Sequence, residues 1–326
     1  MKRSRGGAPL PGVSGVIRSY KRPDSLLQIL NALSAQDHPD FEVVVVEQSD
    51  FPAEFRARLD ALAASDPRLR LVYTEPLGVG GAREAGWRLT KKEIVLTIDD
   101  DDVPLGSDFV SGHARNYLDP NVIGVTGRHV YSPDEVCGYN RRRARRRCLS
   151  YNFFGYPHAF CRFDERLESV GWVHGSNGSL RKSVIERVGG WDASSTDHDE
   201  HPLCLPLLRM RLPGERLVFD PSIRLLRRKD IPGGAQVRFG GPRRIYTMWF
   251  RYYHGLVFKH WPLRATLMYP VFPVASAFSA VRWIWTDSMI HFGILDRIRD
   301  SVRTLVLSPI WYASELLRLA RARFSQ

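Results

Sequence analysis

The chain has 326 residues, of which 44% are hydrophobic and 25% charged. This is the ordinary mixture of a globular protein and enough chain for about two domains, which excludes a disordered, collagen-like or coiled-coil protein. Lys and Arg number 47 against 35 Asp and Glu, so the net charge is +12 and the surface favours polyanions such as nucleic acid, anionic lipid or nucleoside diphosphates. Four cysteines without a C-x-x-C pair exclude a disulfide scaffold and argue against a structural zinc site.

Neither a signal peptide nor a membrane-spanning helix is predicted. The basic N-terminus lacks the apolar run of a signal peptide. The longest charge-free run, residues 265–281, contains two prolines and is shorter than the ~20 residues that a spanning helix needs.

Short apolar runs alternate with helical patterns over the first hundred residues. Apolar or β-branched composition predicts strands at 12–19, 41–46, 69–73 and 93–98. Helices are predicted between them, over 26–36 with Asp24 or Ser25 as the cap, and over 52–64 and 81–89. This alternation predicts an α/β fold with a mostly parallel sheet, whose ligands bind beyond the carboxyl ends of the strands.

The second hundred residues are less regular. We predict strands at 122–131 and at 216–219, the latter ended by Pro221, and a turn at 175–181 that enters a helix at 182–188. From about Arg228 the chain becomes rich in Gly, Pro and Arg, and from residue 245 it has aromatic-rich helical patterns interleaved with Arg and Lys.

An acidic run, Asp99–Asp102, directly follows the buried strand at 93–98. Four adjacent carboxylates repel one another, and the sequence puts no obvious protein cation beside them. Carboxylate oxygens are the ligands that Mg²⁺ and Mn²⁺ prefer, and alternate residues of an extended segment share a face. The run therefore predicts a divalent-metal site in which Asp99 and Asp101 point the same way, the alternative being a solvated acidic turn.

Six segments in order resemble motifs of the family 2 glycosyltransferases, which have the GT-A fold. They are Arg18–Pro23, Val45–Ser49, Gly78–Gly86, Asp99–Asp101, Gly175–Arg181 with the following Gly189–Asp192, and Gly214–Pro221. The resemblance spans about residues 12–226. It implies an inverting transfer of a sugar from a nucleoside-diphosphate sugar to a hydroxyl of a glycan or lipid-linked acceptor, with Mn²⁺ or Mg²⁺ as cofactor.

The resemblance also implies roles for single residues. It assigns the nucleotide to Tyr20, Glu47, Arg83, Asp99 and Asp100. It assigns the metal to Asp101. Trp172, Asn177 and Trp191 fall on the acceptor side.

The carboxylate base of the family precedes a helix that ends in Arg-x-x-x-x-Gly, a pattern that Arg209 and Gly214 match. The acidic cluster upstream offers Asp199 or Glu200 as the catalytic base, with Asp197 third. One position departs from the family, because Arg227 stands where a metal-side His is common. A guanidinium cannot bind a metal but can bind a diphosphate.

These motifs predict a catalytic domain over 1–226, with a nucleotide-binding half at about 12–127 and an acceptor half at 128–226. Residues 227–326 form a linker and an aromatic, basic helical region. Such helices prefer anionic membrane surfaces, which predicts a cytoplasmic protein held peripherally at the inner face of the cell membrane. The alternatives are a subdomain packed on the core or a dimer interface, and the oligomeric state stays open.

Two other functions remain open from the residues alone. Asp99–Val103 also resembles the nucleophile motif of haloacid-dehalogenase phosphatases, with Asp99 as nucleophile, although that motif normally opens its fold. The charge of +12 would suit a non-enzymatic polyanion-binding protein, but no nucleic-acid-binding motif accompanies it, so we expect no nucleic acid partner. A dinucleotide fingerprint fails because Arg83 stands at the third glycine. The arginine-rich run 141–147 is typical of a solvated loop, and the alternative is a segment that binds an anionic acceptor.

Overall fold

The computed structural model describes residues 8–132, 148–151, 157–158, 164–195, 198–228, 247, 263, 271–286 and 294–324. The chain divides into two compact units. The first comprises Met1–Ser150 and His158–Gly234, and the second Tyr151–Pro157 and Ala235–Gln326. The functional boundaries at 127 and 226 stay predictions.

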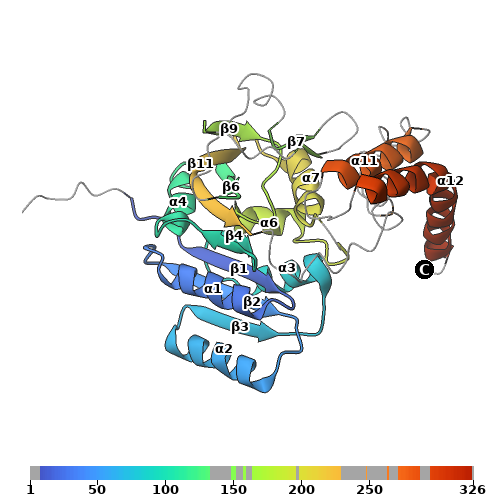
Figure 1. The fold of residues 1–326 in the computed structure, drawn as a ribbon. Helices are drawn as coiled ribbons and strands as arrows, with labels where there is room; N and C mark the ends of the chain where they lie inside the picture. Colours follow the sequence, from blue (N-terminus) through green and yellow to red (C-terminus); the bar gives the residue numbers. More distant parts are fainter. Residues whose placement is uncertain are drawn as a thin grey trace, which may run out of the picture. The chain divides into compact units, whose positions relative to one another are not determined.

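The first unit is built on a mixed, mostly parallel sheet, as the sequence predicts (Figure 1). Among the described residues, nine strands join in the order β3-β2-β1-β4-β10-β6-β11-β5, with β9 pairing β11. The strands are β1 (Val13–Ser19), β2 (Phe41–Glu47), β3 (Leu69–Tyr73), β4 (Ile94–Asp99), β5 (Asp102–Pro104), β6 (Val122–Val130), β9 (Leu167–Val170), β10 (Gly178–Arg181) and β11 (Arg216–Arg227). A separate pair is formed by β7 (Ser150–Tyr151) and β8 (Pro157–His158).

Helices follow the strands along the chain. They are α1 (Pro23–Ser34), α2 (Ala53–Ser65), α3 (Gly78–Arg88), α4 (Phe109–Asn116), α6 (Lys182–Val188) and α7 (Glu200–Met210). The start of α1 is earlier than predicted because Pro23 occupies its first turn, where a proline costs no hydrogen bond. Apolar side chains of β1, β2 and β4 and the inner face of α1 form the core, as their continuous hydrophobic runs require.

Two strands go beyond the prediction. The segment predicted as a turn, 175–181, contributes β10, which runs antiparallel between β4 and β6. The strand predicted to stop before Pro221 continues to Arg227, with a register shift between Asp220 and Arg224 against β6. A proline is tolerated at such an irregularity, so β11 passes through it and ends at the acidic run.

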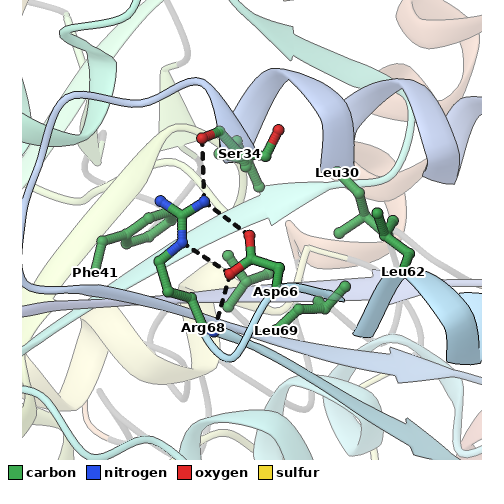
Figure 2. A pocket seen from close by; sticks show the side chains of 9 residues that line it. Leu30, Ser34, Phe41, Leu62, Asp66, Arg68 and Leu69 are labelled. Atoms are coloured by element: carbon green, nitrogen blue, oxygen red, sulfur yellow. Dashed lines mark hydrogen bonds and ion pairs between the residues drawn. The ribbon is translucent and has the colours of Figure 1, made fainter. Parts of the chain in front are cut away.

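A small hollow lies beside the amino ends of β2 and β3 (Figure 2). Leu30, Phe41, Leu62 and Leu69 line it, and Arg68 closes it with a two-pronged contact to Asp66 at 2.7 and 2.9 Å. The predicted ligand edge is at the opposite, carboxyl ends of these strands, so this hollow is not the candidate site.

The second unit contains two long helices, α11 (Phe272–Thr286) and α12 (Ile294–Phe324), which pack against each other. Trp285 on α11 donates a hydrogen bond to Ser301 on α12 over 2.9 Å. None of the described helices is both long enough and apolar enough to cross a membrane.

Candidate active site

Parallel pairing brings the predicted nucleotide residues to one edge of the sheet. On β1, Ser19 lies opposite Glu47 of β2, and Arg18 lies opposite Asp99 of β4. The carboxyl ends of these strands therefore meet, and the acidic run Asp99–Asp102 starts there.

Arginines surround the acidic run. Asp99 contacts Arg18 at 2.9 Å and Arg83 at 2.6 Å. One guanidinium nitrogen of Arg22 contacts both Asp100, at 2.8 Å, and Asp101, at 2.9 Å. The expectation that no protein cation neutralises the run is wrong, because these arginines are distant in sequence and reach it only through the fold.

The fourth arginine is Arg227, at the end of β11. Its Nε and Nη2 donate to the two carboxylate oxygens of Asp102 at 3.2 and 3.1 Å, and Nη2 lies 3.5 Å from Asp99. Asp102 is fully buried and also accepts a hydrogen bond from Ser176. The position where the family commonly has a His thus holds a cation that is already paired with the acidic run.

The same surroundings set the protonation of the run. Burial acts to raise the pKa of Asp99, but Arg18, Arg83 and Arg227 together hold it below its usual range. Burial and the neighbouring Asp102 raise the pKa of Asp101 to about 7, against the opposing effect of Arg22. The run is therefore divided into an ionised carboxylate at Asp99 and a carboxyl that takes up a proton easily at Asp101.

Arg83 is wholly buried, although its helix could have left it on the surface. Its Nη1 donates to the carbonyls of Val16 on β1 and Ile98 on β4, and its Nη2 donates to the carbonyl of Gly175 as well as to Asp99. Burial lowers its pKa, and the charge of Asp99 opposes that effect. Arg83 therefore ties α3 to two strands and to the segment before β10.

The carboxylates of the run fit a divalent cation. Asp99, Asp101 and Asp102 each offer an oxygen, and the three oxygens lie within 4.8 Å of one another. Oxygen donors of this kind suit Mg²⁺ and Mn²⁺. Arg22 and Arg227 contact the same carboxylates, so a cation would compete with them.

The structure brings the candidate base next to this cluster. Asp199 precedes α7, is 2% exposed, and has its Oδ2 3.5 Å from Nε of Arg83. Burial, opposed by Arg18 and Arg83, raises its pKa to about 6. Glu200 opens α7 and contacts His198 and His201 at 3.7 and 3.6 Å. Asp197, the third candidate, lies outside the described residues.

The other predicted nucleotide residues lie at the same edge. The backbone N–H of Tyr20 donates to Asp100 over 3.2 Å, which fixes the segment after β1 to the acidic run. Glu47 is 1% exposed and accepts the backbone N–H of Ser49 over 2.7 Å. Burial raises its pKa, and hydrogen bonding from Ser49 opposes that effect.

The three predicted acceptor residues are all buried. Trp172 packs edge-on against the ring of His201, with ring centres 4.6 Å apart. Trp191 lines a small cavity with Gly175 and Glu200. Asn177 donates from its amide to the carbonyls of Arg128 and Ile223, so it links strands in the interior. Their roles toward an acceptor stay predictions.

Sequence reasoning missed two features of the site. Arg18 and Arg22 were covered by the Arg18–Pro23 motif but were not recognised as partners of the acidic run. A second group of possible metal ligands, His198, Glu200 and His201, also gathers within 4.8 Å. The spacing His-x-Glu-His was the available signal for this group in the sequence.

The arginine-rich run 141–147 lies outside the described residues.

The mixed sheet, with acidic side chains at the carboxyl ends of its parallel strands, fits the GT-A fold that the sequence motifs imply, and the comparisons agree. The family model "Glycosyl transferase family 2" matches residues 14–189, and the chain belongs to that family. The phosphatase and the non-enzymatic alternatives are thereby set aside.

Two curated relatives have names from glycan and glycolipid chemistry. The chain is 25% identical over 224 residues, 65% of its length and 68% of the relative's, to a glucosyl-dolichyl phosphate glucuronosyltransferase of Haloferax volcanii. It is 34% identical over 94 residues, 28% of its length and 26% of the relative's, to the succinoglycan biosynthesis protein ExoO of Rhizobium meliloti.

Solved structures share the fold. A mannosyltransferase of Pyrobaculum calidifontis, in complex with GDP-Man and Mn²⁺, matches with a TM-score of 0.57 at 17% identity, over 97% of this chain and 87% of that one. TarS 1-349 of S. aureus, in complex with UDP-GlcNAc, matches with a TM-score of 0.56 at 13% identity, over 91% of this chain and 81% of that one.

Proposed function

We propose that this glycosyltransferase moves a sugar, with inversion, from a nucleoside-diphosphate sugar to a hydroxyl of a glycan or lipid-linked acceptor. The observation that carries the proposal is the convergence of Glu47, the acidic run and Asp199 at one edge of the sheet. The first curated relative is named for a transfer to a dolichyl-phosphate-linked sugar, which favours the lipid-linked acceptor.

The acidic run has the ligands for Mn²⁺ or Mg²⁺. Asp101 is the central ligand in this proposal, with Asp99 and Asp102 beside it. When bound, such a cation stabilises the negative charge that develops on the leaving diphosphate. Asp99 and Asp100 hold the ribose side of the nucleotide, and Tyr20 and Glu47 flank the base.

Asp199 is the favoured base. An inverting transfer requires a carboxylate that removes the proton of the attacking hydroxyl. Arg83 contacts both Asp199 and Asp99, so one buried guanidinium sets the spacing between the base and the nucleotide side. A pKa of about 6 leaves Asp199 ionised at neutral pH yet basic enough to accept a proton. Glu200, held by two histidines, is the second candidate.

A thermal-shift screen tests the donor. Ligand at 100 times its dissociation constant adds about 2.7 kcal/mol of stability. We expect UDP, GDP or dTDP to raise the melting temperature only with Mn²⁺ or Mg²⁺ present. If none of the three stabilises the protein with either cation, the proposed donor class is wrong.

The second unit supports a peripheral membrane contact. Among the described side chains of α12, eight apolar ones at helical spacing are exposed: Ile294, Leu295, Ile298, Val302, Leu305, Val306, Ile310 and Leu317. Its buried positions are mostly polar, namely Asp300, Ser301, Thr304, Ser308 and Trp311. The helix also carries six arginines against three acidic residues. An outward apolar stripe beside cations suits an anionic lipid surface, which would place the protein at the inner face of the cell membrane.

Liposome flotation tests this contact on the full chain. We expect the protein to float with anionic vesicles at low salt, and the triple variant Ile298→Ser, Val302→Ser, Val306→Ser to float much less. The matched control changes three exposed apolar residues of the first unit, Leu118, Met210 and Leu212, to Ser. Equal flotation of the two variants would refute the membrane role of α12, as would a wild-type protein that stays at the bottom.

A further inference from the structure

We infer that Arg227 is a built-in counter-cation of the acidic run, which a divalent metal displaces and which then binds the diphosphate of the nucleotide. The inference rests on the proposed function and deepens it. It assigns to Arg227 the coupling between metal binding and nucleotide binding.

The contacts place Arg227 where a cation would bind. Its guanidinium donates hydrogen bonds to both carboxylate oxygens of Asp102 and lies 3.5 Å from Asp99. These two residues are also two of the three whose oxygens gather within 4.8 Å. A metal that binds these oxygens would therefore compete with the guanidinium for them, and the two like charges would repel each other.

The backbone holds Arg227 at the site while leaving its side chain room to move. Residues 225–227 of β11 pair antiparallel with β5, and Arg227 lies directly opposite Asp102. The side chain of Arg227 is 23% exposed, whereas that of Asp102 is fully buried. The carboxylate is therefore enclosed, whereas the Arg227 side chain that pairs with it is partly accessible to a ligand.

Electrostatic attraction and repulsion determine whether Arg227 pairs with Asp102 or with the diphosphate. Without a metal, Arg227 offsets the buried charge of Asp102. A divalent cation between Asp99, Asp101 and Asp102 repels the guanidinium, and a diphosphate attracts it, because a guanidinium fork matches phosphate oxygens. Metal alone is therefore bound weakly, and metal with diphosphate is bound cooperatively.

The test titrates Mn²⁺ alone into the full chain, with free Mn²⁺ followed by electron paramagnetic resonance. At an effective dielectric constant of about 20, removing a like charge about 4 Å away favours Mn²⁺ strongly, and partial exposure reduces the gain, so we expect Arg227→Gln to bind Mn²⁺ roughly ten- to a hundredfold more tightly. Arg228→Gln is the matched control, since Arg228 is the next residue and its guanidinium donates to Gln28 on α1. It should change the affinity much less.

Two further measurements locate the effect. Arg227→Gln should melt below the wild type without metal, because Asp102 loses its partner, and should recover on Mn²⁺ addition. Adding Asp101→Asn to Arg227→Gln should remove the gain in affinity; if the gain persists, Mn²⁺ is at His198, Glu200 and His201 and the inference is wrong. Arg227→Lys is the variant to use if Arg227→Gln does not fold. It should also bind Mn²⁺ more tightly than the wild type, because an ammonium cannot pair with both oxygens of Asp102 and with Asp99 at once. The gain in Mn²⁺ affinity should be smaller than for Arg227→Gln, because the positive charge remains.

The nucleotide arm completes the test. With saturating Mn²⁺, whichever of UDP, GDP and dTDP the wild type binds should bind Arg227→Gln at least about tenfold more weakly, because a charged bidentate contact to the diphosphate is lost. Mn²⁺ affinity that is unchanged or lower in both Arg227 variants overturns the inference. A wild type that binds Mn²⁺ but none of UDP, GDP and dTDP instead contradicts the proposed function, and the two failures are distinct.

Discussion

Arg83→Met is the perturbation that most directly tests how the site is held together. The substitution keeps an unbranched apolar stem but removes a guanidinium that donates to three carbonyls and to Asp99 and contacts Asp199. Breaking a buried ion pair from one side costs about 3–5 kcal/mol, because the remaining charge stays buried without its partner. Asp99 keeps Arg18 and Arg227, so we expect a loss of unfolding free energy of about 3–5 kcal/mol rather than a sum over all contacts.

The assay is urea unfolding at neutral pH, followed by far-ultraviolet circular dichroism. Arg88→Met is the matched control on the same helix, since its side chain is 60% exposed and pairs with Glu84 four residues earlier. An exposed pair of that kind contributes about 0.3–0.5 kcal/mol. A loss for Arg83→Met below about 1 kcal/mol, or equal to that of Arg88→Met, would refute the structural role of Arg83.

Two further predictions concern Asp199. Asp199→Asn should leave nucleotide affinity unchanged and lower turnover by ~10²–10⁴-fold, the worth of a positioned proton transfer, while Glu200→Gln should lower it less. The reverse order would move the base to Glu200. Because the base must be ionised and its pKa is raised to about 6, kcat/KM should rise with pH and level off above about 6, falling about tenfold per pH unit below it. A profile that stays flat down to pH of about 5 would exclude Asp199 as the base.

The fold was largely predictable because its buried strands are continuous apolar runs. The strands predicted at 41–46 and 93–98 differ from β2 and β4 by one residue at their ends. The short β10 was missed because its four residues, Gly178–Arg181, have no strand pattern, and pairing on both sides decides their conformation. The extension of β11 was missed because a proline ends most strands, whereas Pro221 falls where the register against β6 shifts.

The site residues were predictable only where a short segment of the sequence contains both the acidic side chains and the strand or helix pattern that positions them. Glu47, Asp99–Asp102 and Asp199 stand at strand or helix ends, and parallel pairing brings the first two together. The pairing of the arginines with the acidic run was not predictable. Arg22 is about eighty residues from its partner Asp100 in the sequence, and Arg227 is more than one hundred residues from Asp102. Their role depends on tertiary contacts that no local pattern encodes.

Calorimetric titration of UDP, GDP and dTDP into the wild type and Asp101→Ala, with and without Mn²⁺, tests the central claim most directly. The account predicts that one nucleotide binds the wild type only with Mn²⁺. It predicts that Asp101→Ala loses this binding while keeping its circular dichroism spectrum and cooperative unfolding. Unchanged nucleotide affinity in Asp101→Ala would contradict the assignment of the metal and the diphosphate to the acidic run.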